Sequence, residues 1–195
     1  MARKPTLIRR LFAPAIARGR KFSRDDRGVT AIEFAILGLP FFTIIFAMIE
    51  TAMVFFAGQV LDSAVEDASR MLKTGQAQAA GYDIDDFREL VCSYTFNLVN
   101  CDLIFLRVAK IPNFAAATSP VPLVCDEDEE TCDWAVEQAY AAGEGREVIQ
   151  VFAYYRWPLL VKLPYFNLAN AADGTRLLGS TRVFRNEPFQ TAEPT

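Results

Sequence analysis

The sequence predicts an α+β protein with a long N-terminal α-helix, whose first half spans a membrane, followed by short helices and a small antiparallel β-sheet. Three observations predict this class. Residues 34–57 are almost uniformly apolar, apolar positions then recur at helical spacing up to Gly75, and residues 147–157 alternate in the manner of a strand. The length of 195 residues suits one domain with appendages.

The apolar run of 24 residues, 34–57, is predicted to cross a membrane. As an α-helix it is about 36 Å long, which exceeds a hydrocarbon thickness of about 30 Å. A buried core helix or a cleaved secretory signal is the alternative, but neither usually has so long a uniform run. The run's one charge, Glu50, would lie near the far interface, within reach of water. Pro40 cannot donate to the carbonyl of Ile36, so we expect a local kink there.

Charge is divided unevenly along the chain. Residues 1–28 carry nine basic and two acidic side chains, whereas residues 29–195 carry 11 basic and 22 acidic ones. The basic head predicts a single-pass membrane protein with a cytoplasmic N-terminus and a C-terminal body on the other side of the membrane. The acidic body would be repelled by phosphate groups, so membrane lipid is an expected partner and nucleic acid is not.

The junction between head and apolar run, residues 27–34, reads RGVTAIEF. It resembles the processing site of type IV prepilins and pseudopilins, which a membrane prepilin peptidase cuts after the glycine. The resemblance implies a cut between Gly28 and Val29, and pairing of Glu33 with the Val29 ammonium of a neighbouring subunit. Alternatively, Gly28 is an ordinary helix start and Glu33 an interfacial charge favoured by the helix dipole.

The longer stretch RGVTAIEFAILGLPFFTIIFAMIE, together with residues 68–75, 155–159 and 183–189, is similar to the TadE-like proteins. These are pseudopilins of the tight-adherence (Tad, Flp) secretion system. The resemblance implies a pilin-like fold and a minor pseudopilin that assembles an adhesive pilus. It also implies that the chain is anchored in the bacterial inner membrane, with its body in the periplasm. Its implied partners are other Tad pseudopilins, the major pilin, inner-membrane platform proteins and the prepilin peptidase. An unprocessed single-pass protein with a periplasmic binding domain is the alternative.

These expectations divide the chain into five parts. They are a basic leader (1–28), a transmembrane helix (29–58), its amphipathic continuation (59–78), a periplasmic α+β domain (79–190) and a tail (191–195). A break near Gly58 is the alternative to one helix from Val29 to Thr74. Entry into the filament, a role in priming its assembly, and retention in the membrane are all compatible with this organisation.

Within the body, we expect a helix over residues 83–94 and strands over residues 103–111, 147–157 and 176–186. The middle strand has a wholly apolar face, while its other face carries Gln150 and Arg156. Antiparallel strands packed on the long helix would bury the apolar face.

Four cysteines follow the apolar run and lie in the half assigned to the oxidising periplasm. Three pairings are possible, and we favour Cys92–Cys101 with Cys125–Cys132 because each closes a short loop. The first bond requires the helix to end between its cysteines, since a straight helix would hold them about 13 Å apart. A four-cysteine zinc site is the alternative, but the spacings contain no C-x2-C pair.

Catalysis has little support in the sequence. The chain contains no histidine and none of the common serine-nucleophile motifs, so we expect no enzyme, no catalytic residue and no cofactor. The acidic run Asp126–Glu130 could bind calcium, but it has no EF-hand spacing, and a solvated loop is favoured. We therefore expect no metal site.

Overall fold

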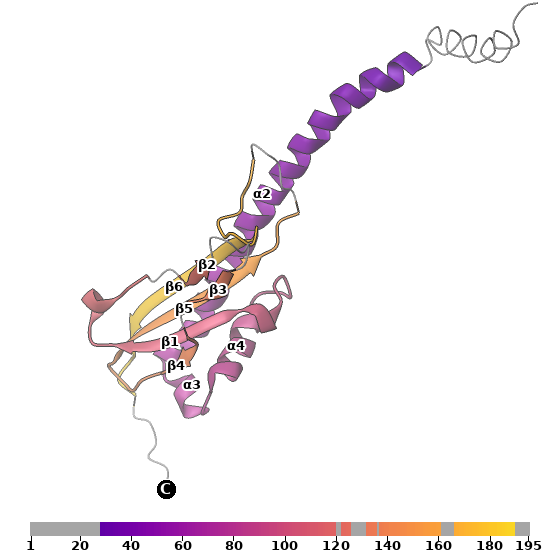
Figure 1. The fold of residues 1–195 in the computed structure, drawn as a ribbon. Helices are drawn as coiled ribbons and strands as arrows, with labels where there is room; N and C mark the ends of the chain where they lie inside the picture. Colours follow the sequence, from indigo (N-terminus) through magenta and orange to yellow (C-terminus); the bar gives the residue numbers. More distant parts are fainter. Residues whose placement is uncertain (1–27, 120–121, 126–131, 136, 161–165, 190–195) are drawn as a thin grey trace, which may run out of the picture. The chain divides into compact units, whose positions relative to one another are not determined.

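The computed structural model describes residues 28–119, 122–125, 132–135, 137–160 and 166–189, and it is an α+β fold, as predicted (Figure 1). The chain divides between Phe46 and Ala47 into two units. The helices are α2 (Val29–Lys73), α3 (Gln76–Ala79) and α4 (Ile84–Ser93), with 3-10 turns at Cys101–Leu103 and Phe114–Ala116. The strands are β1 (Phe105–Ile111), β2 (Leu123–Cys125), β3 (Cys132–Trp134), β4 (Ala139–Tyr140), β5 (Val148–Trp157) and β6 (Arg176–Arg185).

Helix α2 runs without interruption over 45 residues. It passes through Gly58, so the alternative of two helices broken there is wrong. It also passes through Pro40, where the expected kink stays a prediction. The helix ends where the sequence predicts, because Gly75 adopts φ 81° and donates its N–H to the carbonyl of Leu72 at 3.1 Å.

The main sheet has the strand order β4-β1-β5-β6. The three longest strands are antiparallel neighbours, with Val148 opposite Arg185 at one end of β5 and Trp157 opposite Arg176 at the other. The short β4 pairs with β1 in parallel, so the sheet is mixed rather than purely antiparallel. A second sheet consists of β2 and β3 alone.

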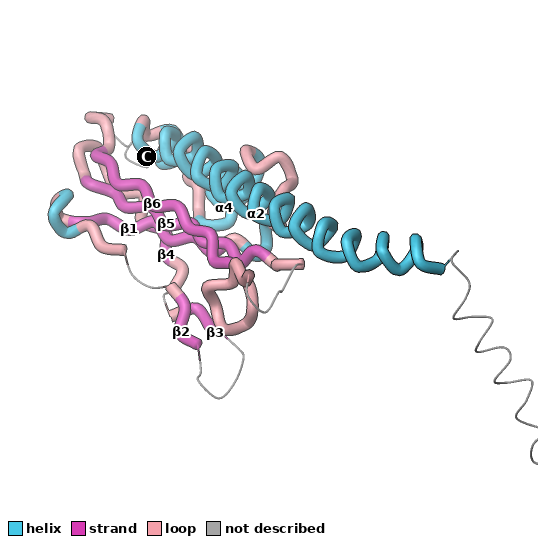
Figure 2. The backbone as a smooth tube through the Cα atoms, turned by 90° about the horizontal axis from the view of Figure 1, so that it is seen from above, coloured by secondary structure: helices cyan, strands magenta, loops and turns pink. Residues whose placement is uncertain are grey.

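The predicted apolar face of β5 packs against α2 and α4. Its residues Ile149, Val151 and Ala153 are fully buried in one core together with helical residues such as Leu61 and Phe87. Figure 2 shows both helices on the same side of the sheet. Alternation along the strand directs the odd-numbered side chains of β5 toward these helices.

The other face of β5 is also covered, which the sequence pattern did not predict. The β2–β3 pair lies on this side (Figure 2), and Trp134 stacks on Phe105 with a ring separation of 4.6 Å. Gln150 is only 2% exposed, and its amide exchanges hydrogen bonds with the backbone of Thr118. Arg156 donates to the carbonyl of Cys132 at 2.7 Å.

Candidate membrane and assembly site

The beginning of α2 has large apolar side chains exposed on every side of the helix. At about 100° per residue, the exposed side chains of Ile36, Leu37, Leu39, Phe41 and Phe42 point in directions spread around the helix axis, so no single stripe here faces a core. Among the described residues, α2 is the one helix long and apolar enough to cross a membrane. The large apolar side chains exposed before Val54, the first buried hydrophobic residue of the helix, are Val29, Ile32, Phe34, Ile36, Leu37, Leu39, Phe41, Phe42, Ile44, Phe46, Met48, Ile49 and Met53.

The predicted processing junction lies at the start of this surface. Gly28 is exposed, with no atom near the position that a Cβ would occupy, and Val29 begins α2. Glu33 is exposed on the second turn of the helix. The basic leader before Gly28 falls outside the described residues. An open glycine beside a helix start is compatible with proteolysis, and both the cut and the pairing of Glu33 stay predictions.

Glu50 was expected to be solvated near the far interface, and the structure shows a different environment. It is only 7% exposed, and its carboxylate accepts a hydrogen bond from the backbone N–H of Leu160. The donor comes from the segment that follows β5, 110 residues further along the chain. The body therefore covers a charge inside the apolar run, where an unpartnered carboxylate would be costly.

An ionic contact joins the second half of α2 to β6. Arg182 donates to the carboxylates of Asp62 at 2.7 Å and Glu66 at 3.3 Å, and Ser180 also donates to Asp62. Burial raises the pKa of Asp62, but the bonds from Arg182 and Ser180 outweigh it and hold that pKa below its usual value. The bond to Asp62 raises the pKa of Arg182. No local pattern predicted this contact, because Asp62 and Arg182 lie 120 residues apart.

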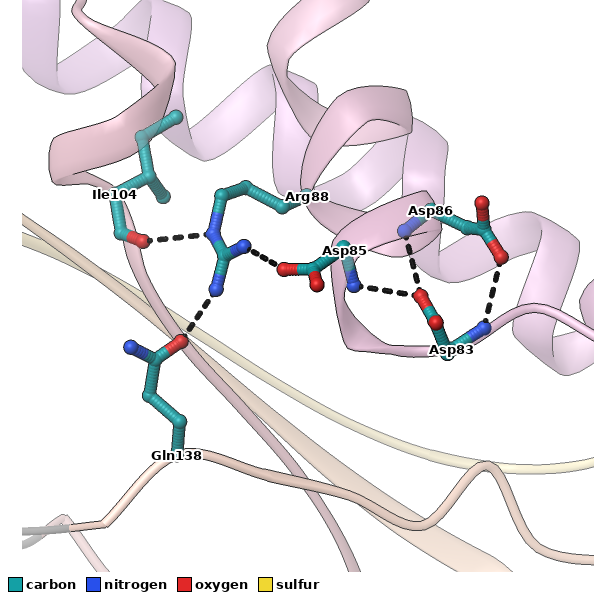
Figure 3. A network of polar contacts seen from close by, with 6 residues as sticks. All are labelled: Asp83, Asp85, Asp86, Arg88, Ile104 and Gln138. Carbon is teal, nitrogen blue, oxygen red and sulfur yellow. Dashed lines mark hydrogen bonds and ion pairs between the residues drawn. The ribbon is translucent and has the colours of Figure 1, made fainter.

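A polar network fixes the start of α4 (Figure 3). Asp83 caps the helix by accepting from the backbone N–H groups of Asp85 and Asp86, and the Asp86 carboxylate accepts from the backbone of Asp83. Arg88 pairs with Asp85 and donates to the side chain of Gln138, ahead of β4. These bonds cap α4 and link it to the segment ahead of β4, so the network has a structural role.

The cysteines follow the predicted arrangement where the structure describes them. Cys92 and Cys101 are joined by a disulfide with 5.7 Å between their Cα atoms. Helix α4 ends between them, and Phe96 and Asn97 adopt left-handed φ values of 55° and 57° that reverse the chain. Cys125 lies opposite Cys132 in the β2–β3 register. The Cys125 side chain lies outside the described residues, so the second disulfide stays a prediction.

The rest of the body offers shallow polar hollows. One of them, of about 500 Å³, lies between α2 and β6 and is lined by mixed charges that include Arg70, Lys73 and Glu187. Within the part of the chain that the structure describes, no cluster of three potential metal ligands occurs. Burial raises the pKa of Tyr140 to about 12, so its phenol stays protonated at neutral pH. The acidic run Asp126–Glu130 falls outside the described residues.

The beginning of the chain matches a known protein family. Residues 28–70 match the family model described as TadE-like protein. The match confirms the resemblance over the junction, the apolar run and the amphipathic part of α2. The length and apolar composition of α2 suit a single membrane-spanning helix. The TadE-like match does not extend to β5 and β6. No curated protein and no solved structure is significantly similar to the chain.

Proposed function

We propose that this TadE-like protein is a minor pseudopilin that assembles a Tad-type adhesive pilus, and that its role is structural rather than catalytic. The observation that carries the proposal is the surface of α2. Large apolar side chains are exposed around the helix directly after a glycine–glutamate junction. Such a surface can pack against lipid or against equivalent helices of other pseudopilins.

In this proposal, α2 starts at the processed Val29 and is held in the inner membrane, with the body in the periplasm. The helix has two possible sets of neighbours, lipid before assembly and other pilin helices during assembly. Glu33 would pair with the Val29 ammonium of an adjacent subunit, because a carboxylate among apolar helices needs a partner. The proposed protein partners are the prepilin peptidase, the platform proteins, other pseudopilins and the major pilin.

The mature N-terminus tests this proposal. Full-length protein is co-expressed with an active prepilin peptidase, extracted from the membrane and mapped by N-terminal mass spectrometry. The expected mature protein begins at Val29, and a Gly28→Leu variant stays uncut because its side chain blocks close approach of the backbone to the peptidase.

A matched control replaces Gly58, which lies on the same helix away from the junction, by alanine, and this variant should be cut normally. The Cβ added at Gly58 would meet only the side chain of Leu178, at 4.0 Å. Wild-type protein that keeps its leader beside an active peptidase would contradict the proposal and favour an unprocessed single-pass protein with a periplasmic binding domain.

A further inference from the structure

The segment that follows β5 brings an exposed leucine to the level of the membrane-spanning run. Leu160 is 92% exposed, whereas its neighbour Leu159 is buried in the main core. Single exposed leucines are common on water-facing surfaces and need no explanation of their own. The position of Leu160 is what distinguishes it.

A backbone hydrogen bond defines that position. The N–H of Leu160 donates to the carboxylate of Glu50, which lies inside the apolar run 34–57. A hydrocarbon core of about 30 Å takes up about 20 helical residues, so a run of 24 leaves its last turn at or beyond the interface. Glu50 is seven residues from the end of the run, about 10 Å along the helix. Leu160 is therefore held near the outer boundary of the hydrocarbon.

The direction of the sheet agrees with this placement. At the far end of α2, the carbonyl of Lys73 accepts from the N–H of Glu187, just beyond the end of β6. Near the membrane-spanning run, Glu50 contacts the segment that follows β5. Strand β5 therefore runs antiparallel to α2, and its end at Trp157 points toward the membrane. Trp157 is the last residue of β5, and tryptophan is enriched at membrane interfaces.

We propose that this end of the body rests on the periplasmic surface of the inner membrane and that the Leu160 side chain inserts into lipid at the boundary between headgroups and acyl chains. The inference rests on the membrane span in the proposed function and adds a second contact outside that span. The Glu50 bond serves two purposes here. It gives the Glu50 carboxylate a hydrogen-bond donor at this depth, where a charge is costly, and it fixes the depth of Leu160 relative to the helix.

A lipid surface is favoured over a protein partner by continuity. The exposed apolar residues of α2 extend to Phe55 and Phe56, past the helical position that contacts Leu160. Leu160 therefore lies at the same level along the helix axis as a surface that must already be surrounded by lipid if α2 spans the membrane. An apolar side chain in this position gains by leaving water without any further partner.

The chain contains a matched control position. Phe114 follows β1 three residues after Ile111, as Leu160 follows β5 three residues after Trp157. Ile111 lies opposite Val148, at the other end of β5. The two positions are thus separated by roughly the length of a ten-residue strand, about 33 Å. Phe114 is also an exposed apolar side chain, at 51%.

Lipid photo-crosslinking tests the inference. A benzophenone amino acid is introduced singly at positions 42, 114 and 160 of the full chain, which is reconstituted in vesicles of radiolabelled phosphatidylethanolamine with phosphatidylglycerol. Position 42 lies within the proposed span and tests that span independently. Peptide mapping of the Cys92–Cys101 disulfide checks that each variant is folded. We expect lipid adducts at positions 42 and 160 and none at position 114.

Each other outcome overturns the inference in a different way. Lipid at position 42 alone would remove the interfacial contact and leave the membrane span intact. Adducts of position 160 with a second copy of the chain would assign this surface to protein contacts. Equal labelling at positions 114 and 160 would show that the body has no fixed orientation on the membrane. An absence of lipid at position 42 would overturn the span and the inference together.

Discussion

The two halves of α2 differ in what surrounds them. In the first half, residues 29–49, large apolar side chains are exposed on all sides. In the second half, residues 50–73, apolar residues such as Leu61, Val65 and Leu72 are fully buried against the body, and from Asp62 onward charged residues lie on the remaining faces. Both halves are regular helix, so helix propensity does not distinguish them. The two halves differ instead in how apolar side chains are distributed around the helix axis. This distribution predicts that lipid or other helices surround the first half and that the sheet packs against the second.

The largest expected effect is that of Glu33→Gln on assembly. If Glu33 pairs with the Val29 ammonium of a neighbour, the variant leaves that ammonium unpaired among apolar helices. Breaking such a pair on one side costs about 3–5 kcal/mol, enough to reduce assembly by a factor of roughly a hundred or more. Membrane insertion should survive because the new side chain is neutral. The measurement is complementation of a deletion strain, in which pili are counted and protein abundance in the membrane fraction is compared.

Glu66→Gln is the matched control, because it removes one carboxylate from the second half of the same helix, where the side chain is 72% exposed. It should support normal piliation. Wild-type piliation by Glu33→Gln at normal abundance would mean that Glu33 only decorates a helix N-terminus, where its interaction is worth about 0.3–1 kcal/mol.

Leu61→Ala and Ile44→Ala compare the two halves directly. Leu61 is fully buried, so its truncation should lower the free energy of unfolding of the body by about 2–5 kcal/mol. Ile44 is 59% exposed in the first half, and its truncation should leave that free energy unchanged. Urea unfolding of the full chain in detergent, followed by the fluorescence of Trp134 and Trp157, measures both. Equal destabilisation by the two variants would contradict the division of the helix.

The Cys92–Cys101 disulfide should stabilise the body without affecting the membrane-spanning half of α2. Replacing both Cys92 and Cys101 by serine releases a loop of nine residues, and the chain-entropy relation predicts a loss of about 2–3 kcal/mol in the free energy of unfolding. Membrane insertion should be unaffected. Ser93→Ala, next to the bond, is the control and should change stability little. A double variant as stable as wild type would show that this bond does not constrain the unfolded chain.

The parts of the fold that were predictable depend on neighbours in sequence. The course of α2, its end at Gly75 and the apolar face of β5 follow from periodicity within single segments, and the Cys92–Cys101 bond closes a short loop. Such signals need no knowledge of what packs where. The junction at Gly28 and Glu33 was predicted from a resemblance that eight adjacent residues carry. The family match covers most of these residues, and the cut itself stays a prediction.

The parts that were missed depend on partners far apart in the chain. Gln150 can be buried because its amide forms hydrogen bonds with the backbone of Thr118, 32 residues away. The short β2–β3 pair covers the same face of the sheet. Glu50 is partnered by Leu160, and its own neighbours in sequence carry no sign of that contact. Strand β4 has only two residues, too few for alternation to show. Polar contacts of this kind are set by the tertiary fold, which local patterns do not encode.

The smallest expected effect concerns the pH dependence of the contact between Asp62 and Arg182. The folded pKa of Asp62 is lowered, so the unfolded state binds more protons, and stability rises with pH between the folded value and the unfolded value near 3.9. The contribution is fully present above that range and is lost as pH falls through it. The side chains are 40% and 28% exposed, so solvent limits the contribution to about 1 kcal/mol or less.

Asp62→Asn should therefore lower the free energy of unfolding at pH 7 by that amount and leave it nearly unchanged at acid pH. Asp83, Glu147 and Asp173 also have lowered pKa values, so the difference between wild type and variant isolates Asp62 from their shared background. Glu66→Gln removes the longer of the two Arg182 contacts and should show a smaller difference. Urea unfolding of the full chain in detergent at several pH values measures these differences. The difference in free energy of unfolding between wild type and Asp62→Asn could instead stay constant from acid to neutral pH. That result would show that the charge of Asp62 contributes nothing to stability, and that apolar packing holds β6 on the second half of α2.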